Sequence, residues 1–138
     1  MRIVIDTNVL VSGLLNASGN PGRVVDGLLL GDLSPVVDDR ILAEYRDVLT
    51  RPKFGFDLAQ RDRVMEFIDA ISERVVAPPL SVQLPDPGDL PVLEVAACAA
   101  VDALVTGNMR HFPAEHRGRV VVLTPTELVL RWAAERAR

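Results

Sequence analysis

Apolar residues along the chain recur with two spacings, one typical of strands and the other of amphipathic helices. Short β-branched runs at residues 2–6 and 34–37 are each followed by a stretch in which apolar side chains return every three or four positions. The helix expected after residues 34–37 opens with an aspartate, a preferred N-cap, and ends before Pro52. This alternation predicts an α/β fold in which a central, mostly parallel sheet of about five strands has helices on both faces.

The second half of the chain continues the same alternation. An amphipathic helix is predicted from Leu58 to about Ser72, and an alanine-rich helix is predicted to follow Asp89, its expected N-cap, and to end near Ala100. No repeat or linker interrupts the pattern, so we expect a single domain over residues 1–138. The remaining elements are predicted as strands over residues 74–79, 102–107 and 119–125 and a last helix over residues 124–138.

Composition narrows the class of protein. The chain has 138 residues, of which 49% are hydrophobic, enough to bury one substantial core. Residues 1–6 lack the pattern of a secretory signal, and no apolar stretch is long enough to span a bilayer, so we expect a soluble, cytoplasmic protein with no membrane partner. Cys98 is the one cysteine, which excludes an internal disulfide, and its alanine-rich surroundings predict a small buried side chain.

The net charge of −4 argues mildly against a protein that coats nucleic acid through charge alone. It does not exclude a nuclease, because bound divalent cations reverse the local sign of an acidic site. Four polar or small residues stand at the predicted carboxyl ends of strands, where ligands of α/β sheets bind. They are Asp6, Thr106, Gly107 and Asn108.

Carboxylates provide the candidate chemistry. Glu44 lies three residues after Ile41 and four before Val48, so we expect it to share the apolar face of its helix and to point inward. An inward carboxylate without a counterion would protonate or destabilise the fold, and a divalent cation shared with other acids removes that cost. Histidine and cysteine are too few for a zinc site, whereas oxygen ligands suit Mg²⁺ or Mn²⁺. The acids that the sheet could gather are Asp6, Glu44, Asp86 and Asp89.

The sequence resembles a known family in four segments that together span most of the chain. The segments "IVIDTNVLVSGLL", "ILAEYRDVLTRPKF", "DPGDLPVLEVA" and "DALVTGNMRHF" resemble those of the PIN-domain family, especially the bacterial VapC-like toxins. The resemblance implies a Mg²⁺- or Mn²⁺-dependent endoribonuclease that cuts single-stranded RNA and leaves a 5′-phosphate. It further implies a homodimer and a small antitoxin as partner.

Transferred residue by residue, the resemblance makes Asp6, Glu44 and Asp89 the catalytic and metal-binding acids. Asn108 stands near the point where many relatives carry a fourth acid, and because it brings no charge it leaves the number of metal ions and the vigour of catalysis open. The supporting residues implied are Asn8, Asp86, Thr106 and Asn108. Weaker candidates for contact with RNA, which could equally be solvated surface residues, are Arg51, Lys53, Arg110 and His111.

Two other functions are compatible with parts of the pattern. A receiver-like signalling domain also gathers acids at strand ends, but it needs an acidic pair after the first strand and a late lysine, whereas Asp6 is followed by Thr7 and the one lysine is Lys53. A catalytically silent PIN-like scaffold that binds RNA or a protein partner stays open because of Asn108. Glu94, on the alanine-rich helix, is expected to be solvated.

Overall fold

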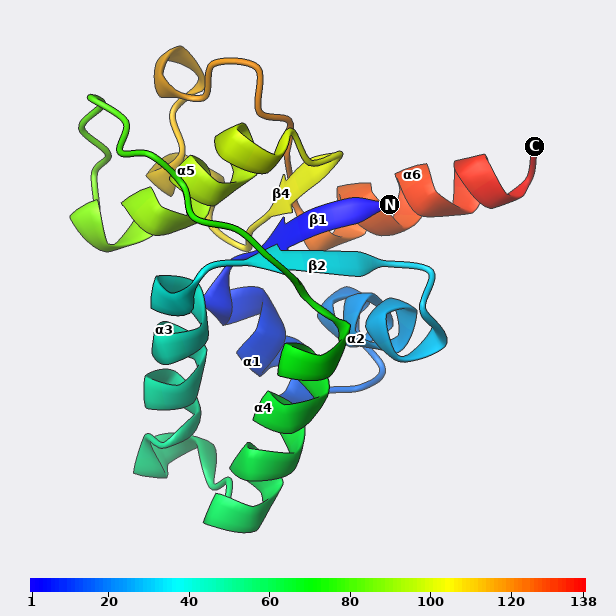
Figure 1. Cartoon of the computed structure of the whole chain (residues 1–138). Helices are drawn as coiled ribbons and strands as arrows, with labels where there is room; N and C mark the ends of the chain where they lie inside the picture. Colours follow the sequence, from blue (N-terminus) through cyan, green and yellow to red (C-terminus); the bar gives the residue numbers. More distant parts are fainter.

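A five-stranded parallel sheet runs through the centre of the computed structural model, which describes all 138 residues (Figure 1). The strand order is β3-β2-β1-β4-β5, and every neighbouring pair is parallel. The α/β fold with about five mostly parallel strands is therefore confirmed. The strands are β1 (Arg2–Ile5), β2 (Ser34–Val37), β3 (Glu73–Arg74), β4 (Ala103–Val105) and β5 (Val122–Leu123).

Six α-helices surround this sheet. Figure 1 shows α5 on one face, whereas α1 and α4 lie on the other. This arrangement follows from the connections: the chain moves outward from β1 to β3 through α1 to α4 and returns across the sheet through α5 to β4. The helices are α1 (Thr7–Leu15), α2 (Asn20–Leu30), α3 (Asp39–Leu49), α4 (Leu58–Ile71), α5 (Leu90–Ala99) and α6 (Pro125–Arg136). Short 3₁₀ turns occupy Pro52–Phe54, Pro87–Asp89, Met109–His111 and Ala114–His116.

The outer strands are shorter than the sequence predicts. The strand expected over residues 74–79 is limited to Glu73–Arg74, after which one more ladder bond joins the Val75 N–H to the Val37 carbonyl at 2.9 Å. Pro78 and Pro79 then have no N–H to donate, and the chain continues without regular structure to the turn before α5.

The core is one cluster of 29 buried hydrophobic residues centred on β1 and β4. Cys98 is an exception to expectation: it is exposed, because it lies on the face of α5 that turns away from the sheet. None of the helices has the length and apolar character that crossing a bilayer requires.

Candidate active site

A cavity of about 320 Å³ opens at the carboxyl end of the central strand, where β1 passes into α1. The three acids predicted to act together all line it, and they come from the end of β1, from the middle of α3 and from the turn before α5. Its lining residues are Asp6, Thr7, Asn8, Val11, Ser12, Glu44, Val48, Arg51, Phe54, Asp89 and His111.

Asp6 is the buried acid of this cavity, with 5% of its surface exposed. The Thr7 N–H donates to its Oδ1 at 2.9 Å, which caps α1, and the Thr106 hydroxyl donates to its Oδ2 at 2.8 Å. Burial raises the pKa of Asp6, and the two hydrogen bonds oppose that rise because they favour the ionised form. Asp6 is thus both the helix cap and a member of the acidic cavity.

Asn8 and Thr106 link the loop after β4 to the end of β1. Asn8 Oδ1 accepts a hydrogen bond from the Gly107 N–H at 3.2 Å. The Thr106 hydroxyl, which donates to Asp6, accepts from the Asn108 N–H at 3.0 Å. This geometry is compatible with the orienting role predicted for Asn8 and Thr106, whereas Asn108 contributes its backbone to the link.

Glu44 reaches the cavity, but it is exposed rather than buried as predicted. The buried positions of α3 in this region are Ile41, Tyr45 and Val48, and Glu44 stands at the border of the apolar face that they form. The Thr7 hydroxyl donates to Glu44 Oε2 at 2.6 Å. Thr7 is a site residue that the sequence analysis missed, although its position directly after Asp6 could have indicated it.

Asp89 occupies the N-cap position of α5, as predicted, but its side chain makes no capping hydrogen bond. Asp86 has the turn role, accepting the Gly88 N–H at 2.9 Å. Asp89 Oδ2 is buried without a hydrogen bond and lies 2.7 Å from His111 Nδ1, in a geometry that does not align the ring N–H with the carboxylate. Burial, together with the charges of Asp6 and Asp86, raises the pKa of Asp89 to about 6, against the opposing charge of His111.

The four residues predicted to contact RNA fall in different places. His111 is half-buried and lines the cavity, and ligand atoms of Asp86, Asp89 and His111 all lie within 4.8 Å of one another. Arg51 also lines the cavity and is 3.4 Å from Asp47. Neither of the other two belongs to the lining: they are Lys53, whose Nζ lies 5.0 Å from the centre of the Phe54 ring, and the exposed Arg110.

Glu94 corrects a further expectation, because it is 2% exposed rather than solvated. Its carboxylate accepts from Arg40 Nη1 at 2.7 Å and from the Leu80 N–H at 2.7 Å. Arg40 also pairs with buried Asp38 at 2.7 Å. This set of contacts joins the start of α3, helix α5 and the irregular segment that leads to Asp86.

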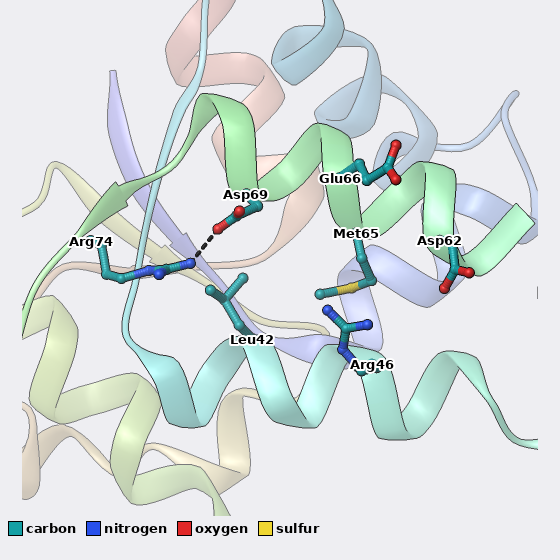
Figure 2. A pocket seen from close by; sticks show the side chains of 7 residues that line it. All are labelled: Leu42, Arg46, Asp62, Met65, Glu66, Asp69 and Arg74. Carbon is teal, nitrogen blue, oxygen red and sulfur yellow. Dashed lines mark hydrogen bonds and ion pairs between the residues drawn. The ribbon is translucent and has the colours of Figure 1, made fainter.

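A second hollow lies between α3 and α4, where Figure 2 shows Arg46 and Met65 facing each other across the two helices. Its charges are mixed, and Arg74 is paired with Asp69. It contains none of the residues predicted to act, so the acidic cavity is the site to which the candidate residues belong.

A family model for the PIN domain matches residues 2–110. The chain belongs to the PIN domain family. An uncharacterized protein of Methanocaldococcus jannaschii is 31% identical over 72 residues, which are 52% of this chain and 46% of that protein, so the match covers less than half of the relative. PIN domains are generally nucleases, and this family membership supports hydrolysis of nucleic acid.

Two solved structures share this PIN fold. VapBC2 of Rickettsia felis, bound to a DNA fragment from its promoter, superposes with a TM-score of 0.59 at 14% identity over 90% of this chain and 98% of that one. PAE2754 of Pyrobaculum aerophilum superposes with a TM-score of 0.63 at 17% identity over 97% of this chain and 90% of that one. At these identities the likeness shows the fold alone.

The residues present fit the divalent metal that PIN domains typically use. The donors are hard carboxylate oxygens from Asp6, Glu44 and Asp89, the type that Mg²⁺ and Mn²⁺ bind. Asp89 Oδ2 is buried with His111 Nδ1 as its near polar neighbour at 2.7 Å, and a bound cation would add to the compensation of its charge. The acids repel one another at neutral pH, and a shared cation would remove that repulsion.

Proposed function

We propose that this PIN domain is a Mg²⁺- or Mn²⁺-dependent endoribonuclease that hydrolyses phosphodiester bonds of single-stranded RNA. The observation that carries the proposal is the gathering of Asp6, Glu44 and Asp89 from three distant segments around one cavity, with Asp89 Oδ2 buried and without a hydrogen bond. Three carboxylates drawn to one cavity repel one another, and a cation held among them would offset that repulsion and the burial of Asp89 Oδ2.

Each acid would have a distinct part. Asp6 and Asp89, the more buried two, would hold the cation, which when bound supplies an acidified water and neutralises charge on the phosphodiester. Thr106 and the Thr7 N–H fix both oxygens of Asp6 and favour its ionised form against the effect of burial. Glu44, oriented by the Thr7 hydroxyl and open to solvent, would complete the ligand set or accept a proton from the attacking water.

The cavity rim suggests how a nucleic acid strand would be held. Arg51 is the basic residue that lines the cavity next to apolar Phe54 and Val48, so a phosphate could meet the guanidinium while a base or sugar packs on the apolar side. The net charge of −4 provides no broad basic surface, which favours local recognition of a strand at the cation over coating of a duplex.

The proposal extends to the toxin of a toxin–antitoxin pair. Its support is the resemblance of the four segments to VapC-like toxins, together with the fold shared with VapBC2. We accordingly propose a homodimer in the cytoplasm, inhibited by a small antitoxin.

The decisive experiment is cleavage of a mixed-sequence single-stranded RNA by wild type and Asp6→Asn protein with Mn²⁺, Mg²⁺ or EDTA. We expect wild type to cut only with a divalent cation, and Asp6→Asn to lose at least about 100-fold in rate, the upper end of what removing a ligand's supporting partner costs. Asp26→Asn, an exposed aspartate on α2 away from the cavity, is the matched control and should keep full activity.

A silent scaffold is the second candidate, favoured by Asn108 in place of a fourth acid. Wild type that stays inert with both cations, while folded and free of inhibitor, would reject the nuclease. Binding of the same RNA without cleavage would then support the scaffold.

A further inference from the structure

His111 enters the acidic cavity from the loop after β4 and provides the one imidazole beside the acids. Its Nδ1 lies 2.7 Å from Asp89 Oδ2, and Asp86 offers an oxygen within 4.8 Å of both. Histidine 111 is therefore placed where a cation held by Asp89 would also meet an imidazole.

The contact between His111 and Asp89 differs from an ordinary hydrogen bond. The two atoms are close enough for one, but the ring N–H is imperfectly aligned with Asp89 Oδ2, so the contact is a close polar one. Adjacent ligands of one octahedral cation are about 3 Å apart when each bond is about 2.1 Å. The observed separation and misalignment suit two ligand atoms that face a common point.

The backbone around His111 fixes the point from which its side chain enters the cavity. The His111 N–H donates to the Asn108 carbonyl at 3.1 Å and closes the 3₁₀ turn Met109–His111. The next residue, Phe112, is fully buried and anchors the turn to the core. A turn anchored in this way needs little backbone ordering when His111 binds a cation, which favours ligation.

We propose that His111 is a nitrogen ligand of the bound cation, next to Asp89, and that it makes the site prefer a first-row transition cation such as Mn²⁺ over Mg²⁺. Mg²⁺ favours sites built of oxygen, whereas imidazole binds transition cations more strongly. The inference rests on the proposed function, because it concerns the cation of that same site.

The first test detects the nitrogen directly, without a variant or an activity assay. Mn²⁺ bound to wild type is examined by pulsed electron paramagnetic resonance, with histidine carrying ¹⁴N or ¹⁵N. The chain has two histidines, so a coupling that changes with the isotope must come from His111 or His116. We expect this coupling in wild type and in His116→Asn, and its loss in His111→Asn.

The second test measures preference by titrating Mn²⁺ and Mg²⁺ into the same proteins by calorimetry. His111→Asn should lower the affinity for Mn²⁺ at least about tenfold, because losing even an outer partner of a metal ligand costs that much. The same substitution should lower the affinity for Mg²⁺ much less. His116→Asn should bind both cations as wild type does.

Each contrary outcome has a distinct meaning. Bound Mn²⁺ that needs Asp89 but shows no histidine coupling would overturn the inference and leave the proposed nuclease intact. Equal weakening of Mn²⁺ and Mg²⁺ by His111→Asn would reject the claimed preference. Absence of any Mn²⁺ binding to folded wild type would overturn both the inference and the proposed function.

Discussion

Asp89 combines a buried oxygen with two acidic neighbours, and both features disfavour its ionised form. Its pKa of about 6 in the folded protein exceeds the value near 3.9 expected in the unfolded chain. The folded state thus holds this proton more tightly, and ionising Asp89 destabilises the metal-free fold.

The metal-free protein should therefore gain stability relative to Asp89→Asn as the pH falls from 7 to 5. The linkage gives a relative gain of about 1 kcal/mol over this range, and it is complete below the unfolded pKa near 4. Urea unfolding in EDTA at several pH values would measure it. Parallel pH profiles for the two proteins would contradict the assigned pKa.

Thr106 is the residue whose hydroxyl satisfies two groups at once, Asp6 Oδ2 and the Asn108 N–H. Thr106→Val keeps the shape but removes both hydrogen bonds, so we expect a loss of about 1–3 kcal/mol in the free energy of unfolding. Thr126→Val, which removes an exposed hydroxyl that accepts from Asn20, is the control and should cost less. Equal losses in the two variants would show that the buried link contributes nothing special.

Among the elements, the contacts between Arg40, Asp38 and Glu94 join α3 to α5 and hold the segment before Asp86. Arg40→Ala leaves two buried carboxylates without their cation and should cost about 2 kcal/mol, less than a fully buried pair because Arg40 is half exposed. Adding Glu94→Leu should restore part of the loss, since an apolar side chain replaces the stranded charge. The free energies of unfolding are measured by chemical denaturation. Arg63→Ala, which removes an exposed arginine on α4, is the control. A double variant less stable than Arg40→Ala alone would contradict this account.

The type of each element was predictable from the sequence because the hydrophobic pattern has a different period in helices and in strands. The exact buried face and the end residues of each element were less predictable. Each helical residue turns by about 100°, and Glu44, although three residues after Ile41 and four before Val48, stands at the border of the apolar face rather than within it. Glu94 was misjudged because its partners, Arg40 and Leu80, are distant in sequence. Asp89 has the predicted N-cap position, but that its side chain lines the cavity and makes no capping hydrogen bond could not be read from local propensity.

At the scale of the whole molecule, the alternation of strands and helices predicted the parallel sheet, and the sheet brought the three acids to one cavity. What sequence could not provide is contact between side chains, such as those of Thr7 with Glu44 and of His111 with Asp89. Their roles in catalysis remain predictions, which the cleavage and binding experiments test.

A cation held between β1, α3 and the turn before α5 should stabilise the entire fold. At about 100 times its dissociation constant it would add about 2.7 kcal/mol. For a chain of 138 residues this corresponds to an increase of roughly 10 °C in Tm. Calorimetry with Mn²⁺ or EDTA should show the increase in wild type and its loss in Asp6→Asn. An equal increase in that variant would place the cation elsewhere.

The sheet also tapers, from four residues in β1 to two residues in each outermost strand, β3 and β5. An outer strand of two residues presents hardly any free backbone groups on which another chain could add. This parallel sheet should therefore be a poor template for fibril growth, and the protein should resist edge-to-edge aggregation at the high concentrations that binding and resonance measurements need.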